Sequence, residues 1–240
     1  MLSSPKARVR MITRPLRILA LLAVACGRQD GKDGQGEPAA RVSTQDTASA
    51  AGTDRPAILF LGTSLTAGYG LSDPALAYPA LIQAKLDSAG RPFHVVNAGV
   101  SGESSAGALA RIDWLMSQGP VAVLVIETGA NDGLRGQDPD SVRARIQVII
   151  DRARQAAPAV RIVITGMEAM PNLGADYVRR FRDIYPALAR ANHAELVPFL
   201  LAGVAGVDSL NQADGIHPTP AGQRIVAENV WNAIERVTRR

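Results

Sequence analysis

The sequence predicts an α/β fold, arranged as a three-layer α/β/α sandwich with a five-stranded parallel sheet in the middle. Short apolar runs rich in Val and Ile alternate with longer amphipathic stretches from Ala57 to the end of the chain. This alternation is typical of parallel strands that are covered by helices on both faces. Hydrophobic residues make up 47% of the chain and aromatic ones only 4%, so we expect one domain with an aliphatic core.

The expected strands and helices follow one another along the chain. Five apolar runs have the length and composition of buried parallel strands, and they span residues 57–61, 93–97, 121–127, 161–165 and 195–198. Helical patterns lie between and after them, at residues 74–89, 104–118, 139–157, 175–192 and 219–237. The last helix has a clear start, because Thr219 is suited to cap it and Pro220 fits the first helical position.

Residues 1–25 are predicted to form a signal peptide for export. They carry five of the 26 Lys and Arg residues and none of the 22 acidic ones, and an apolar run follows Arg17. The run ends in an Ala-x-Ala pattern, which favours cleavage after Ala25. Cys26, the single cysteine, would then begin the mature chain. It resembles the lipidation site of a bacterial lipoprotein and predicts a lipid-anchored protein of the periplasm or cell envelope. An ordinary secreted protein with a free thiol is the alternative.

Residues 26–54 are predicted to be a flexible linker, and residues 55–240 the folded domain. The linker is rich in Gly, Ser, Thr and Asp and lacks apolar periodicity, as flexible tethers do. Beyond the signal peptide, basic and acidic residues nearly balance. A nucleic-acid partner is therefore not expected, since such surfaces are strongly basic. We expect contact with a membrane only through the N-terminal lipid.

Candidate catalytic residues follow the strands, because the site of an open parallel sheet lies beyond the carboxyl ends of its strands. Ser64 comes shortly after the first strand, in a tight turn between a strand and a helix. There its hydroxyl can project into the site, and the helix N-terminus favours negative charge nearby. The alternative is a serine that only caps the helix.

His217 is the candidate base among the three histidines of the chain. It lies in a loop with Asp214 three residues before it, so the carboxylate can bond to Nδ1 and leave Nε2 to face Ser64. His94 begins an apolar strand and His193 ends an Arg-rich helix, and we interpret both as structural or solvated. On spacing alone, a local Asp turn beside an incidental histidine is an equal alternative.

Gly102 and Asn131 are candidates for stabilising an oxyanion. A glycine lets its backbone N–H approach a substrate closely, and an asparagine amide is a second donor. With the N–H of Ser64 they would supply three donors. Taken singly, each is more readily explained as a turn residue.

These segments resemble the four sequence blocks of the GDSL, or SGNH, hydrolase family. They begin at Gly62-Thr63-Ser64-Leu65, Ala98-Gly99-Val100-Ser101-Gly102, Thr128-Gly129-Ala130-Asn131-Asp132-Gly133 and Asp214-Gly215-Ile216-His217-Pro218. The likeness is greatest to the bacterial thioesterase, lysophospholipase and arylesterase branch, and it covers most of the chain from Ala57. The resemblance implies a flavodoxin-like sandwich and hydrolysis of carboxylic esters or thioesters of small-molecule or lipid substrates. It also implies Ser64 as nucleophile, Asp214 and His217 as acid and base, Ser64, Gly102 and Asn131 as oxyanion donors, and no metal or organic cofactor.

Two positions depart from the family pattern. Thr63 stands where the family has the Asp of Gly-Asp-Ser-Leu, and Ala130 where a Gly is frequent. Thr63 is not a member of the triad, so the mechanism is expected to survive with altered rate or substrate positioning. The segment is also not the nucleophile elbow of α/β-hydrolases, because Thr66 occupies the position of its last glycine.

Three alternatives remain open from the sequence. A non-catalytic flavodoxin-like binding protein would use the Ser/Thr-rich loop after the first strand for phosphate, but it leaves Asp214 and His217 unexplained. A catalytically inactive, lipid-anchored binding module is the second. A carbohydrate O-acetyl esterase of the same superfamily is the third. The apolar loop at residues 166–173 suits an acyl chain better than a sugar, although it could equally tuck its Met residues into the core.

Overall fold

The computed structural model describes residues 55–239, and they form one parallel five-stranded sheet covered on both faces. The strand order is β2-β1-β3-β4-β5, and all four strand pairings are parallel. The strands are β1 (Ala57–Gly62), β2 (His94–Gly99), β3 (Val121–Ile126), β4 (Arg161–Thr165) and β5 (Glu195–Val197). The order reverses direction at β1, as in flavodoxin-like sheets. This arrangement confirms the predicted fold class.

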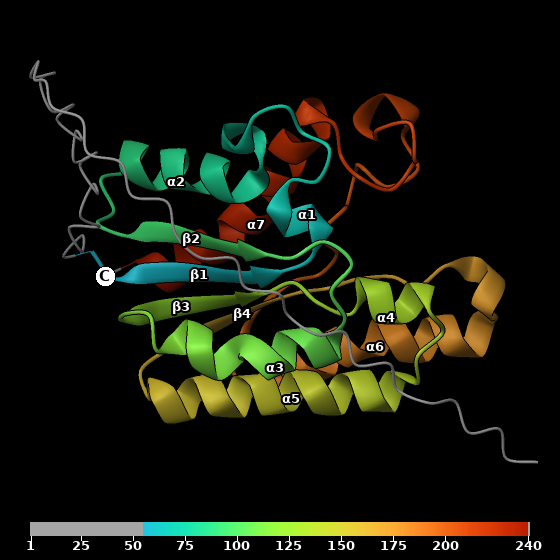
Figure 1. Ribbon diagram of the computed structural model, residues 1–240, viewed down its shortest axis with the longest axis horizontal. Helices are drawn as coiled ribbons and strands as arrows, with labels where there is room; N and C mark the ends of the chain where they lie inside the picture. Colours follow the sequence, from blue (N-terminus) through green and yellow to red (C-terminus); the bar gives the residue numbers. More distant parts are fainter. Residues whose placement is uncertain (1–54, 240) are drawn as a thin grey trace, which may run out of the picture. The chain divides into compact units, whose positions relative to one another are not determined.

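Two layers of helices enclose the sheet (Figure 1). One layer consists of α2 (Tyr78–Ser88) and α7 (Pro220–Thr238), and the other of α3 (Ser105–Met116), α5 (Pro139–Ala156) and α6 (Ala175–Ala191). Each of these helices begins and ends within a few residues of its predicted bounds. Thr219 caps α7 as expected, since its hydroxyl accepts from the N–H of Gly222 and Pro220 takes the first turn.

The core lies where the central strands meet both helical layers. All six residues of β1 are buried, as are five of the six residues of β3. Strands enclosed on both faces read as continuous apolar runs, because neither face meets water. This is why the alternating pattern of a one-sided strand is absent from Ala57–Gly62 and Val121–Ile126.

Strand β2 corrects one expectation, because it is not a buried strand. It lies at the edge of the sheet, and Val96 and Asn97 are exposed on it. Side chains cover part of its free edge: Gln83 Oε1 accepts from the N–H of Val95, and Gln83 Nε2 donates to the carbonyl of Phe93. Such capping protects an edge strand from pairing with another chain.

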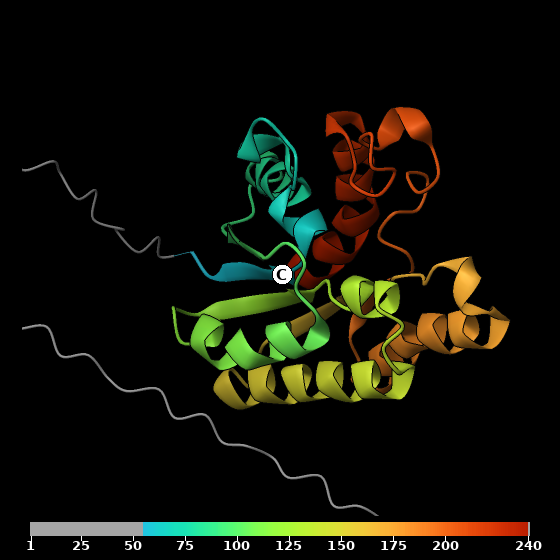
Figure 2. The ribbon, with the colours of Figure 1, turned by 45° about the vertical axis from the view of Figure 1, so that its right-hand side comes forward.

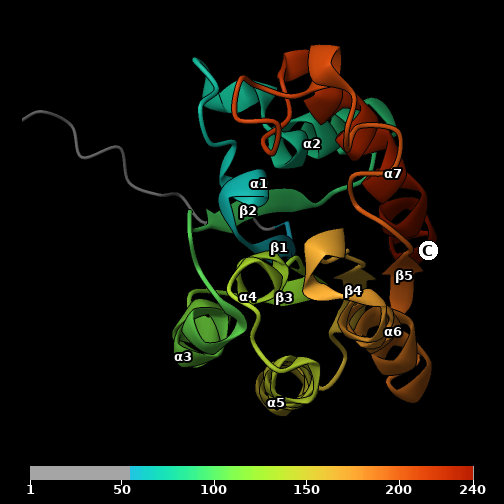
Figure 3. The ribbon, with the colours of Figure 1, turned by 90° about the vertical axis from the view of Figure 1, so that its right-hand side faces the viewer.

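Two short helices at the carboxyl end of the sheet were not predicted. They are α1 (Ser64–Ala67) after β1 and α4 (Ala130–Leu134) after β3. They are too short for an apolar period to identify them. Figure 3, which faces the carboxyl ends of the strands, shows α1 and α4 in front of β1 and β3. Three 3₁₀ turns, Pro74–Leu76, Pro171–Leu173 and Asp208–Leu210, complete the described elements.

Among the helices of residues 55–239, none combines the length and hydrophobicity needed to cross a lipid bilayer.

Candidate active site

Three side chains from the two ends of the domain meet beyond the carboxyl end of β1. Ser64 is the first residue of α1, and Asp214 and His217 lie in the loop before α7. The Nε2 atom of His217 lies 2.8 Å from Ser64 Oγ, and its Nδ1 atom lies 2.7 Å from Asp214 Oδ2. This is the hydrogen-bonded chain of a hydroxyl, an imidazole and a carboxylate that activates a serine in many hydrolases. The sequence separation of Ser64 and His217 is 153 residues.

The loop that carries His217 is organised by the same carboxylate. Asp214 Oδ1 accepts from the backbone N–H groups of Ile216 at 2.9 Å and of His217 at 3.0 Å, which leaves Oδ2 for the imidazole. These hydrogen bonds, that of the His217 N–H above all, lower the pKa of Asp214 from 3.8 to about 2. Asp214 is therefore ionised at any neutral pH and favours the tautomer that carries its proton on Nδ1.

Tyr69 and Gln212 join the two halves of this site. The ring of Tyr69 lies against that of His217, with 4.7 Å between the ring centroids. Gln212 Nε2 donates to the carbonyl of Tyr69 at 2.8 Å, and the N–H of Gln212 donates to the carbonyl of His217 at 2.7 Å. Figure 2 shows the corresponding segments, blue-green after β1 and orange-red before α7, beyond the end of the sheet. The histidine is thus held from the side of Ser64 as well as from its own loop.

The candidate oxyanion donors face the same space. Ser64 begins α1, and the first N–H groups of a helix have no partner within it. Gly102 has a φ of +78°, a conformation that favours glycine, and the side on which a Cβ would lie is open. Asn131 Nδ2 donates one hydrogen to the carbonyl of Glu103 at 3.0 Å. This bond orients the amide and leaves its second hydrogen for a ligand.

Two arginines hold the loop that carries Gly102. Arg111 donates to both carboxylate oxygens of Glu103 at 2.8 and 2.7 Å, and to the carbonyl of Ala98 at 2.6 Å. Arg135 Nη2 donates to the carbonyl of Gly102 at 3.0 Å. A donor that is fixed before the reaction stabilises developing charge without reorganisation, so this bracing suits the loop to an oxyanion site.

All five predicted site residues line one pocket of about 320 Å³. The other residues that line the pocket are mainly apolar. Three of them, Tyr69, Leu134 and Ile216, have 54%, 52% and 48% of their surface exposed. Exposed large apolar side chains around a polar centre are typical of a site for an apolar ligand.

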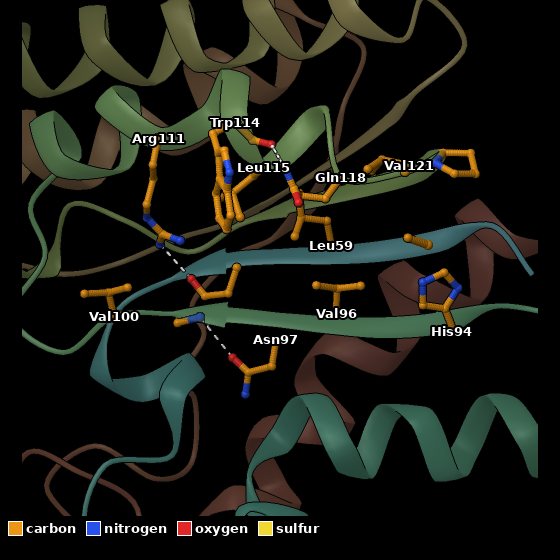
Figure 4. Close-up of a pocket in the computed structure, with 15 residues that line it drawn as sticks. Leu59, His94, Val96, Asn97, Val100, Arg111, Trp114, Leu115, Gln118 and Val121 are labelled. Atoms are coloured by element: carbon orange, nitrogen blue, oxygen red, sulfur yellow. Dashed lines mark hydrogen bonds between the residues drawn. The ribbon is translucent and has the colours of Figure 1, made fainter. Parts of the chain in front are cut away.

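A second hollow of about 400 Å³ lies along β1, β2 and α3 and contains none of the predicted site residues. Figure 4 shows Arg111 and Trp114 of α3 above it, and Val96 and Asn97 of β2 below. It exists because α3 leaves the edge strand partly uncovered. No acid–base pair of the triad type lines it, so it is not the catalytic centre.

The other sequence interpretations have mixed outcomes. His94 and His193 lie outside the pocket, as expected. In the loop at residues 166–173, Met167 is buried in the core while Met170 is exposed. Neither lines the pocket, and the burial of Met167 matches the alternative of a loop that tucks Met into the core. Cys26 and the expected signal peptide and linker lie outside the described residues.

Sequence reasoning missed the residues that support the site. Arg111, Glu103 and Gln212 carry no motif of their own and act through backbone groups that only the fold brings near. Glu127 had a detectable signal: it is a lone acid at the end of the apolar run 121–127, a place where a charge needs a partner or a function.

Comparison with known proteins identifies the family. Residues 60–225 match the model of the GDSL-like Lipase/Acylhydrolase family. Esterase TesA of Pseudomonas aeruginosa is 40% identical over 178 residues, covering 74% of this chain and 87% of that protein. Thioesterase 1/protease 1/lysophospholipase L1 of Escherichia coli K12 is 36% identical over 176 residues, covering 73% and 81%. Arylesterase of Vibrio mimicus is 34% identical over 182 residues, covering 76% and 90%.

Solved structures agree with this result. The crystal structure of TesA superposes with a TM-score of 0.72 at 39% identity, covering 75% of this chain and 99% of that one. The esterase EstA from Pseudoalteromonas sp., inhibited by monoethylphosphonate, gives a TM-score of 0.70 at 30% identity, covering 75% and 97%. Family membership and the meeting of Ser64, Asp214 and His217 set aside the two non-catalytic alternatives. The chain belongs to the GDSL-like lipase/acylhydrolase family and is a hydrolase of ester bonds.

Proposed function

We propose that Ser64 is the nucleophile of a two-step acyl transfer, with His217 as its base and Asp214 as the residue that orients the imidazole. One observation carries the proposal: the continuous chain of short hydrogen bonds from Ser64 Oγ through His217 to Asp214. A serine hydroxyl is a poor nucleophile until a base takes its proton, and Nε2 is in the position to take it.

The proposed reaction uses only groups of this site. Ser64 Oγ bonds to the carbonyl carbon as its proton passes to His217 Nε2, and the carbonyl oxygen becomes an oxyanion held by the N–H groups of Ser64 and Gly102 and by the Asn131 amide. His217 then protonates the leaving oxygen or sulfur as its bond to carbon breaks. Water attacks the acyl-enzyme, gives a proton to His217 and releases the acid, and the proton returns to Ser64.

The substrates we propose are esters or thioesters with an apolar acyl group, of the arylesterase, acyl thioesterase or lysophospholipase type. The apolar rim of Tyr69, Leu134 and Ile216 supports this class, because such side chains bind hydrocarbon by removing it from water. The names of the relatives span these same activities.

Two measurements test the proposal together. A panel of p-nitrophenyl esters from acetate to palmitate, with an acyl-CoA, a lysophospholipid and acetylated xylan, would give kcat/KM for each class. A p-nitrophenyl alkylphosphonate should modify one residue, and peptide mass analysis should locate the adduct on Ser64. Adduct formation at another residue, or hydrolysis of acetylated xylan alone, would contradict the proposal.

Asn131→Ala is expected to lower kcat by about 10²–10³-fold, which is the usual cost of losing one oxyanion donor. KM should change little, because the amide bonds to charge that develops in the transition state. Steady-state kinetics on p-nitrophenyl butyrate measure both. Asn232→Ala, in α7 and outside the pocket, is the matched control. An Asn131→Ala enzyme with unchanged kcat would remove Asn131 from the oxyanion site.

We further propose that the protein is exported and attached to a membrane by lipid on Cys26. The basic and apolar leader, the Ala-x-Ala pattern before Cys26 and the polar stretch after it support this. Cys26→Ser is expected to move the full-length protein from the membrane pellet to the soluble fraction after expression in a bacterium that processes lipoproteins. Ser64→Ala, as control, should stay in the pellet. A wild-type protein that is already soluble would contradict the anchor but not the esterase.

A further inference from the structure

A buried glutamate lies directly beneath the turn that carries Ser64, and the mechanism above does not use it. Glu127 follows β3 and is only 1% exposed. Its Oε2 atom accepts from the backbone N–H of Thr63 at 2.7 Å and from the Thr66 hydroxyl at 2.8 Å. The Thr63 hydroxyl lies 3.0 Å from each carboxylate oxygen. Its partners thus stand one residue before and two residues after the nucleophile.

We propose that Glu127 is a positioning residue for the nucleophile: its carboxylate ties Thr63 and Thr66 to the end of β3 and so sets the direction of Ser64 Oγ toward His217. The inference rests on the proposed role of Ser64. It assigns Glu127 no contact with substrate.

The hydrogen-bond directions require an acceptor at this place. An ionised carboxylate only accepts, and three donors point at it. The Thr66 Oγ1 atom also lies 2.7 Å from Tyr78 OH. Because the Thr66 hydroxyl gives its one hydrogen to Glu127, it must accept from Tyr78. Replacing the carboxylate by an amide would place a donor against these groups and disturb the chain.

Steric fit shows that the turn has little freedom around the carboxylate. A Cβ added to Gly62 would lie 2.0 Å from Thr66 Oγ1 and 2.8 Å from Glu127 Oε2. Only glycine allows β1 to pass this close. At the next position, the Thr63 hydroxyl supplies a donor that Glu127 accepts.

Protonation of Glu127 near neutral pH should change its hydrogen bonds to Thr63 and Thr66. Burial raises the pKa of Glu127 from 4.5 to about 7, although the hydrogen bonds from Thr63 and Thr66 lower it. The titratable groups that face it are Tyr78 of α2 and Tyr185 of α6, and burial, with the nearby Glu127 charge as the second cause, raises the pKa of both well above 10.0. Both phenols stay neutral, so Glu127 is the group that changes charge.

Ionisation of Glu127 should change activity and stability in opposite directions. A carboxyl whose pKa is raised on folding stabilises the fold at low pH, and this contribution is lost as pH rises from 4.5 to about 7. The ionised form, which accepts all three hydrogen bonds, exists above that range. Activity should therefore rise with pH while this part of the stability falls, which a purely structural role would not produce.

Substitutions at Thr63 test the hydrogen bond between its hydroxyl and Glu127 with little change in the shape of the side chain. Thr63→Val removes the hydroxyl and should lower kcat about 10-fold with KM unchanged, as expected for losing a hydrogen bond to a charged group. Thr63→Ser keeps the hydroxyl and should retain most of the activity. Thr128→Val is the matched control, because the Thr128 hydroxyl is buried without a hydrogen-bond partner among residues 55–239. Equal kcat in Thr63→Val and Thr128→Val would overturn the inference.

Glu127→Gln provides the pH readout. We expect kcat to fall about 100-fold, the scale of a displaced reacting group. The acid limb of log(kcat/KM) should be less steep in Glu127→Gln than in the wild type, because the variant lacks the carboxyl whose pKa is raised to about 7. An unchanged kcat and slope would refute the role of Glu127. If this variant does not fold, the Thr63 pair decides alone. Ser64→Ala run in parallel distinguishes the failures: if it stays active, the proposed function itself is wrong.

Discussion

Replacing Ser64 by Ala is expected to lower kcat on p-nitrophenyl butyrate by at least about 10⁴-fold, to the residual rate that binding and the oxyanion donors can give without a nucleophile. The reason is geometric. Ser64 Oγ is the atom that lies 2.8 Å from the candidate base. The Ser64 hydroxyl makes none of the hydrogen bonds to Glu127. Removing this hydroxyl therefore leaves the packing of β1 and α1 intact.

The measurement combines kinetics with a fold control. Thermal unfolding followed by circular dichroism should give a similar midpoint for the wild type and Ser64→Ala. Ser88→Ala, an exposed serine of α2, is the matched control and should keep full activity. Persistence of wild-type turnover in purified Ser64→Ala would falsify the assignment of the nucleophile.

Removing the base should cost almost as much as removing the nucleophile, and removing both should cost little more. Residues that act as one unit show strongly non-additive losses. His217→Ala and the Ser64→Ala/His217→Ala double variant are therefore expected to have nearly the same kcat as Ser64→Ala. If the loss of kcat in the double variant equalled the product of the two single losses, the two side chains would act independently. That result would contradict a role for the 2.8 Å contact between them.

Local features of the sequence predicted most of the fold. The runs at residues 57–61 and 121–127 are apolar at nearly every position because both faces of those strands are buried, and runs of this length are typical of buried parallel strands. The edge strand β2 differs in both composition and burial, because it carries His94 and Asn97 whereas β1 and β3 have no polar side chain. These two polar residues were a signal of exposure, but the extent of that exposure depends on which helix covers the strand.

The candidate site was predictable only as far as its motifs reach. The motif residues Ser64, Asn131 and His217 could be named because each stands in a short pattern after a strand or before a helix. Glu127 could not be given a role, because its partners at positions 63 and 66 are set by the register of β1 against β3. That register places Leu61 beside Ile126, and a shift by one residue would have moved the carboxylate to the other face.

Asp214→Asn is expected to lower kcat by about 10⁴-fold, although it changes only one atom. Asp214 Oδ1 accepts from the N–H groups of Ile216 and His217, and an Asn oxygen can accept both in the same place. The Asn nitrogen must then replace Oδ2 at 2.7 Å from His217 Nδ1. Because that nitrogen donates, the imidazole must carry its proton on Nε2, where it can no longer accept the proton of Ser64.

The pH dependence separates this tautomer effect from loss of the loop. The pKa of Asp214 is lowered to about 2, so the stability that its charge contributes is present above 3.8 and lost only as pH falls toward 2. From about pH 5 to pH 9 the carboxylate is therefore ionised throughout, so a loss of wild-type activity within this range cannot come from protonation of Asp214. Asp208→Asn, the same change at an exposed position, should leave the kinetics unaltered.

Two results with Asp214→Asn would contradict the expected one, and each would have a different physical cause. A variant with near wild-type kcat would show that the imidazole keeps its working tautomer without the carboxylate, so that the 2.7 Å contact orients the loop and not the proton. A variant that loses activity together with its thermal midpoint would show that the Asn oxygen does not hold the two backbone N–H groups. If Asp214 acts on the proton of His217, a large loss of kcat is expected with at most a small fall in the midpoint, because the Asn oxygen keeps both backbone hydrogen bonds while the substitution changes the tautomer and removes the charge beside the imidazole.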